Sequence, residues 1–124
     1  MSKQIFTENA PAAIGPYSQA IDTGHLLFLS GTMPIDPETN TLVDNDITVQ
    51  TKQIMKNIGA VLSEAGYEVN DVVKTTCFLS DIGNFTAFNE VYAEYFTSKP
   101  ARSCVAVKDL PKGALVEVEV IASK

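Results

Sequence analysis

Two stretches of the chain carry apolar residues at helical spacing. In residues 47–65 they recur every three or four positions, with Asp46 placed as an N-cap and Gly66 where a helix end favours a left-handed residue. In residues 85–96 aromatic and aliphatic side chains form a second stripe, with Asn84 placed to cap it. The pattern predicts two amphipathic helices.

The other apolar residues fall into short runs that are typical of strands. Thr23-Gly24 reads as a tight turn between the first two full strands, and the prolines and Asx residues of 34–40 indicate a loop. A short additional strand is expected near Ile5. The main strands are predicted over residues 18–22, 26–30, 72–79, 101–107 and 115–122. The resulting order of strands and helices predicts an α/β (α+β) fold with one mixed sheet.

The last predicted strand carries apolar residues on both of its faces. Val116, Val118 and Val120 alternate with a set that mixes apolar and acidic residues, Leu115, Glu117, Glu119 and Ile121. Two helices can cover only one face of a sheet. We therefore expect the second face to be covered by another subunit, in a homo-oligomer.

Length and composition limit the function classes. A chain of 124 residues, 45% hydrophobic and 19% charged, suits one folded domain over residues 1–124. The formal net charge of −6 and the scattered basic residues disfavour nucleic-acid and membrane-surface binding. The sequence shows neither an export signal nor a membrane-spanning run, so we expect a soluble cytoplasmic protein.

Metal chemistry has little support in the sequence. The two cysteines, Cys77 and Cys104, do not have zinc-ligand spacing, and His25 is the single histidine. We therefore expect no metal site, and free thiols in a reducing compartment. No phosphate loop or dinucleotide-binding glycine pattern is present in the sequence.

Arg102 is the most informative charged residue. Strand alternation places it on the same face as Cys104, in a strand that is otherwise apolar. One interpretation is an ion pair with Glu117 or Glu119 on the neighbouring strand, because an arginine is costly to bury alone. The other is a planar fork that binds the carboxylate or phosphate of a ligand. The residue alone does not decide between them.

Glu117 and Glu119 share one strand face, and each has two interpretations. On an exposed edge they would simply deter aggregation. A buried one would have a raised pKa and could act as a general acid or base. Cys104 near an arginine could be a nucleophile, but with His25 as the only histidine we prefer a buried, unreactive thiol.

Several motifs along the chain together resemble the reactive intermediate deaminase family (RidA, also called YjgF or L-PSP). The matching segments are residues 9–19 (NAPAAIGPYSQ), 29–31 (LSG), 34–39 (PIDPET), 73–76 (VKTT), 88–92 (FNEVY) and 100–104 (PARSC). The resemblance implies a chorismate-mutase-like fold with two helices on one face of the sheet. It also implies a homotrimer whose sheets face inward, with a site in each intersubunit cleft. The implied reaction is cofactor-independent hydrolysis of 2-imino acids, formed from enamines such as 2-aminoacrylate, to 2-keto acids and ammonia.

The resemblance also implies roles for individual residues. Arg102 would bind the substrate carboxylate, and Glu117 would activate the attacking water, with Glu119 as the alternative base. The remaining cleft-lining positions would be Tyr17, Ser30, Gly31, Asn89 and Cys104, the last through its backbone amide. The short segment 96–100, which carries Lys99 where relatives commonly have a longer lead-in ending in an aromatic residue, departs from the family pattern. The alternative functions are a non-catalytic trimeric sensor of 2-keto acids and, ranked lowest, an endoribonuclease.

Overall fold

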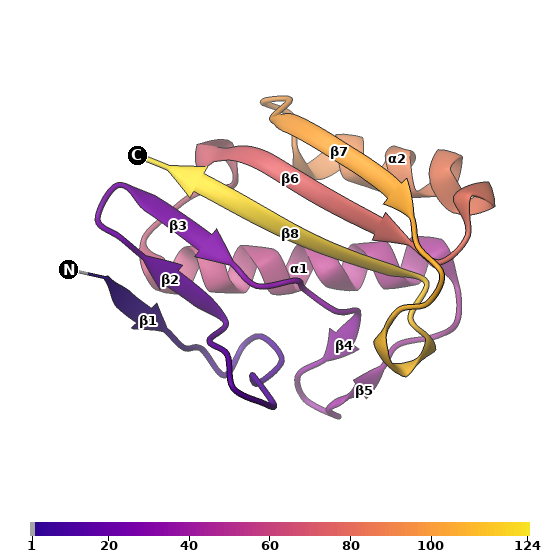
Figure 1. Ribbon diagram of the computed structural model, residues 1–124, viewed down its shortest axis with the longest axis horizontal. Coiled ribbons are helices and arrows are strands. Elements are labelled where there is room, and N and C mark those ends of the chain that lie inside the picture. The colour runs from indigo at the N-terminus through magenta and orange to yellow at the C-terminus, as the bar shows by residue number, and fades with distance from the viewer. Residues whose placement is uncertain (1) are drawn as a thin grey trace.

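A six-stranded mixed sheet forms the centre of the protein in the computed structural model, which describes residues 2–124 (Figure 1). Its strands follow the order β1-β2-β3-β8-β6-β7, and β6 and β7 are the parallel pair. The strands are β1 (Lys3–Ile5), β2 (Ala20–Asp22), β3 (Leu26–Leu29), β6 (Val72–Leu79), β7 (Ala101–Ala106) and β8 (Val116–Ser123). The predicted main strands are confirmed within one or two residues at each end. The prediction near Ile5 is confirmed as β1.

The long helix α1 (Ile47–Ala65) begins and ends where the sequence predicts. The side chain of Asp46 accepts a hydrogen bond of 2.9 Å from the amide of Val49, which satisfies one of the free donors at the helix start. Gly66 ends the helix at φ 80°, a left-handed conformation that glycine adopts without strain.

Helix α2 (Phe85–Tyr95) begins at the predicted residue, with Asn84 in the N-cap position. The side chain of Asn84 makes no capping hydrogen bond. Instead, Asp81 accepts a bond of 2.8 Å from the amide of Gly83 and begins a 3-10 turn, Ile82–Asn84, that runs directly into α2. The predicted cap position is therefore confirmed, but capping by the Asn84 side chain is not, because the helical turn already begins after Asp81.

The segment predicted as a loop at residues 34–40 contains local structure. Strands β4 (Ile35–Asp36) and β5 (Thr41–Leu42) form a small antiparallel hairpin that is separate from the main sheet. Asn57 of α1 holds this segment, because its buried amide donates to the carbonyls of Met33 and Ile35 at 3.1 and 2.9 Å. The hairpin is therefore fixed against α1.

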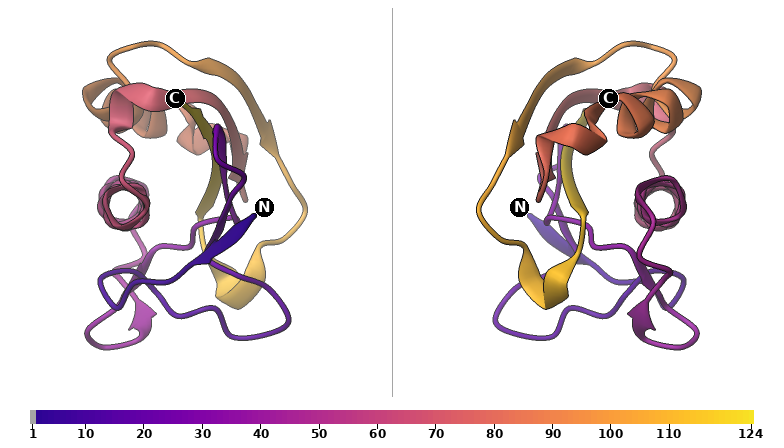
Figure 2. Two further views of the ribbon diagram at one scale, coloured as in Figure 1. Left: turned by 90° about the vertical axis from the view of Figure 1, so that its left-hand side faces the viewer. Right: turned by 90° about the vertical axis from the view of Figure 1, so that its right-hand side faces the viewer.

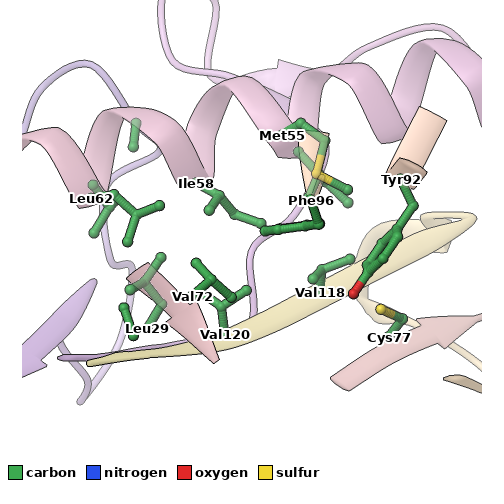
Figure 3. Close-up of a cluster of buried hydrophobic side chains, with 14 of the residues drawn as sticks. Leu29, Met55, Ile58, Leu62, Val72, Cys77, Tyr92, Phe96, Val118 and Val120 are labelled. Carbon is green, nitrogen blue, oxygen red and sulfur yellow. The ribbon is translucent and has the colours of Figure 1, made fainter. Parts of the chain in front are cut away.

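Both helices lie on the same side of the sheet (Figure 2). Ile58 and Leu62 of α1 point toward the sheet, from which Val118 and Val120 of β8 point toward the helices, and these four side chains are almost fully buried (Figure 3). This confirms the prediction that the two helices cover one face only. Neither helix among residues 2–124 combines the length and the apolar character that a membrane span requires.

Neither helix nor any other element of residues 2–124 covers the central part of the opposite face of the sheet (Figure 2). Its central part carries Phe28, Phe78 and Ile121 beside Glu117 and Glu119, as the pairing of Phe78 with Glu117 and of Phe28 with Ile121 shows. Phe28 is 41% exposed. The apolar side chains of this open face suit a contact with another surface better than contact with water.

Candidate functional site

A cavity of about 660 Å³ lies between the N-terminal segment, the end of β3 and the first half of β8. Tyr17, Ser30, Gly31 and Glu117, four of the residues predicted for a site, line it together. Apolar side chains form much of the remaining wall, namely Ala10, Pro11, Ile14, Met33 and Ile35. The cavity thus combines a small polar region with an apolar wall, as small-molecule sites commonly do.

Glu117 is the titratable group at the centre of this polar region. It is half-buried, and burial, followed by the negative charge of Glu119, raises the pKa of its carboxyl group above the ordinary value. Glu119 lies on the same face but is exposed. Each of the two interpretations therefore applies to one residue of the pair. Glu117 has the environment of a general acid or base, whereas Glu119 is in contact with water.

The segment after β3 brings Ser30 and Gly31 to Glu117. The amides of Thr32 and Val118 each donate to the other residue's carbonyl, at 2.7 and 3.2 Å, and this bridge fastens the segment to β8. The Ser30 hydroxyl donates to the carbonyl of Ser18 at 2.6 Å, so it fixes the chain next to Tyr17. The Ser30 hydroxyl therefore has a structural role, because it stabilises the wall of the cavity.

Arg102 lies elsewhere, at the edge of the sheet on β7 (Figure 1). Its Nη1 donates to the side-chain oxygen of Asn89 at 2.6 Å. The guanidinium carbon stands 4.7 Å from the ring centroid of Tyr92 and 5.6 Å from that of Phe85, a cation–π arrangement. The side chain is exposed, so one amide and two rings orient it while part of its fork faces solvent.

The ion pair considered for Arg102 is not formed, because β6 separates β7 from β8. In addition, Arg102 is aligned with Thr75 of β6, which faces the helices, whereas Glu117 is aligned with Phe78, which faces the open side. Arg102 and Glu117 therefore lie on opposite faces of one sheet. Within a single chain the predicted anchor and the predicted base cannot meet on one small substrate.

Cys104 lies beside Arg102 and next to Cys77, its register partner on β6. Both cysteines are free thiols. Burial raises the pKa of Cys104 despite the nearby arginine, and burial raises the pKa of Cys77 to about 12. Thiols in this state are weak nucleophiles, which agrees with the preference for an unreactive Cys104, although its side chain is only partly buried.

Three residues of these two regions were missed by the sequence reasoning. Gln19 lines the cavity and is hydrogen-bonded to the N-terminal segment. The ring of Tyr92 packs against the guanidinium of Arg102. Lys112 is the positively charged residue among those that line the cavity. Lys112 also has a φ of 60°, uncommon for a lysine. The family-like segment around Gln19 and the aromatic stripe of α2 were visible signals, but their contacts depend on long-range packing.

Comparison with known proteins identifies the family. The family model described as Endoribonuclease L-PSP matches residues 7–124. The chain belongs to this family, which is also known as RidA or YjgF. A RutC family protein of Pyrococcus horikoshii is 56% identical over 125 residues, covering 100% of this chain and 99% of the relative. A 2-iminobutanoate/2-iminopropanoate deaminase of Salmonella typhimurium is 46% identical over 126 residues, covering 98% of each chain.

Solved structures of the RidA family have the same fold. The crystal structure of Escherichia coli TdcF with bound serine has a TM-score of 0.94 and 40% sequence identity, with 98% of each chain covered. This confirms the family and the fold that the motifs indicate. Among residues 2–124, His, Cys, Asp and Glu side chains do not gather in groups of three or more that could hold a metal ion.

Proposed function

We propose that the protein hydrolyses reactive 2-imino acids, and the enamines from which they form, to 2-keto acids and ammonia. The observation that carries the proposal is the half-buried carboxyl group of Glu117, with its raised pKa, in a cavity that has an apolar wall. The proposal is further supported by the family and by the Salmonella typhimurium relative, a 2-iminobutanoate/2-iminopropanoate deaminase.

In the proposed reaction Glu117 handles both protons. Its carboxylate accepts a proton as water attacks C2 of the protonated imine, which gives a 2-amino-2-hydroxy acid. The same carboxyl group then donates that proton to the amine. As the C–N bond breaks, the carboxylate accepts the hydroxyl proton, so that ammonia and the 2-keto acid leave, and the carboxyl group passes this last proton to ammonia or water. A raised pKa suits this exchange, because it makes the carboxylate a stronger base than an ordinary glutamate. The imine carbon is electrophilic enough that the step needs no covalent nucleophile.

Arg102 would bind the substrate carboxylate through its free edge, held in plane by Asn89 and the ring of Tyr92. Because Arg102 and Glu117 lie on opposite sheet faces, we propose that each site forms between two copies of the chain, in a homotrimer. The exposed apolar side chains of the open face, Phe28 and Val105 among them, support such a contact. One copy would supply Arg102, Asn89 and the Cys104 backbone amide, and the next would supply the cavity with Glu117.

Endoribonuclease activity, after which the family is named, has less support from this site. Two carboxylates, Glu117 and Glu119, lie in the cavity with one cation, Lys112. A phosphate backbone is attracted by clustered arginine and lysine and repelled by carboxylates. The single histidine, His25, lies in the exposed turn between β2 and β3, away from the cavity.

The test follows pyruvate release while a serine dehydratase generates 2-aminoacrylate. We expect the wild-type protein to accelerate release, and Arg102→Ala and Glu117→Gln to abolish the acceleration. Lys108→Ala and Glu94→Gln, at exposed positions outside the site, serve as charge-matched controls and should keep full activity. Binding of 2-keto acids by a wild type that gives no acceleration would contradict the deaminase and favour a ligand sensor.

A further inference from the structure

Gly31 lies directly against the carboxylate of Glu117. A Cβ atom at position 31 would overlap Oε2 of Glu117 and would stand 2.9 Å from its Cδ and 3.3 Å from its Cγ. We propose that Gly31 is a positioning residue, whose missing side chain provides the space that holds the Glu117 carboxylate in the cavity. The catalytic meaning of this contact rests on the function proposed above.

The backbone conformation does not require glycine at this position. Positive φ angles occur at Gly15, Gly24, Gly66 and Gly113, whereas the φ of Gly31 lies outside the left-handed region. An alanine could therefore adopt the same backbone conformation without strain. What excludes a side chain at position 31 is the space already filled by Glu117.

The main chain on both sides of the contact is fastened and cannot easily move away. Thr32 and Val118, the residues that follow Gly31 and Glu117, exchange two hydrogen bonds of 2.7 and 3.2 Å. The amide of Ser30 donates to the carbonyl of Gln19 at 3.0 Å. The part that can yield is the end of the Glu117 side chain, which has rotatable bonds and an open cavity beside it.

A methyl group at position 31 should therefore displace the carboxylate rather than unfold the protein. Gly31→Ala also restricts the unfolded chain, which offsets part of any strain. We expect the melting temperature of Gly31→Ala to stay within about 5 °C of the wild type. Gly59→Ala is the matched control, since a Cβ at Gly59 meets no atom within 4 Å.

The kinetic test compares these two variants in the pyruvate-release assay. Gly31→Ala should lower kcat about 100-fold, the scale of a displaced acid–base group, and change KM little, because Arg102 still binds the carboxylate. Gly59→Ala should keep wild-type values. A Gly31→Ala variant that folds and keeps wild-type kcat would overturn the proposal.

A second readout does not depend on activity. The side-chain carboxyl carbon of Glu117, labelled with ¹³C, is titrated by NMR in the wild type and in Gly31→Ala. Displacement from the half-buried position should lower its pKa toward the ordinary value. An unchanged pKa would overturn the positioning role. A lowered pKa in Gly31→Ala, combined with an inactive wild type, would support the positioning role and contradict the deaminase.

A shorter carboxylate provides a third arm. The double variant Gly31→Ala/Glu117→Asp leaves room for the new methyl group, because the aspartate side chain is one carbon shorter than that of Glu117. The loss in kcat from Glu117→Asp should therefore be clearly smaller in the Gly31→Ala background than in the wild type. Losses that multiply independently would show that the two residues do not share this space and would contradict the proposal.

Discussion

The side chain of Gln19 joins the N-terminal segment to the rest of the cavity wall. Its Oε1 accepts a hydrogen bond of 2.7 Å from the amide of Thr7, and its Nε2 donates to the carbonyls of Thr7 and Pro11 at 3.0 and 2.8 Å. Gln19 and Thr7 are buried, so these groups have little access to water if the side chain is removed. Segment 7–11 thus depends on one amide for three short hydrogen bonds.

Gln19→Leu keeps the approximate volume and removes these three bonds, together with a longer one of 3.4 Å to the carbonyl of Ala10. At about 1 kcal/mol for each bond, and more where a buried amide or carbonyl is left without a partner, we expect a loss of about 2–4 kcal/mol in the free energy of unfolding. We also expect the amide of Thr7 to lose its protection against hydrogen exchange. Because Ala10 and Pro11 line the cavity, activity should fall together with stability.

The measurement is urea unfolding at one fixed protein concentration, together with amide exchange resolved at Thr7. Gln4→Leu is the matched control, because Gln4 lies exposed on the edge strand β1, and it should change stability by less than about 0.5 kcal/mol. A Gln19→Leu protein that unfolds at the wild-type urea concentration, with Thr7 still protected, would refute this reasoning.

Three further substitutions test the site. Arg102→Lys, which keeps the charge but loses the planar fork, should raise KM in the pyruvate-release assay about 10- to 100-fold. Glu117→Gln should raise the melting temperature at pH 8 but not at pH 4: folding raises the pKa of Glu117, so its stabilising effect is present at acid pH and is lost as the pH rises through that pKa. An equal change at both pH values would contradict this. Tyr92→Phe removes the buried bond of 2.8 Å to Thr75 and should cost about 1–2 kcal/mol in urea unfolding, while the ring over Arg102, and hence the activity, remains.

The local structure was readable from the sequence because local chemistry determines it. Asp46 and Gly66 mark the ends of α1, and the β-branched run of 72–79 coincides with β6. Asn84 has the right residue type for a cap, but the preceding turn from Asp81 takes over that role. Competing local signals a few residues apart could not be ranked without the three-dimensional structure.

The site was readable only in part, because its geometry depends on strand order. Alternation correctly placed Arg102 with Cys104, and Glu117 with Glu119, within each strand. It could not show that β6 lies between β7 and β8, or that the two pairs face opposite sides of the sheet. The contact between Gly31 and Glu117 joins distant parts of the chain. The family resemblance placed both residues at one cleft, but nothing in the sequence shows that they touch.

In the proposed homotrimer, each site takes Arg102 and Glu117 from two different copies of the chain. Arg102→Ala and Glu117→Gln proteins, each inactive alone, are mixed in equal amounts, unfolded, refolded together and assayed for pyruvate release. In a randomly mixed trimer about a quarter of the sites would combine an intact arginine with an intact glutamate, so about a quarter of wild-type activity should return. If native mass spectrometry shows mixed trimers and no activity returns, the two residues do not act across an interface, and the account is contradicted.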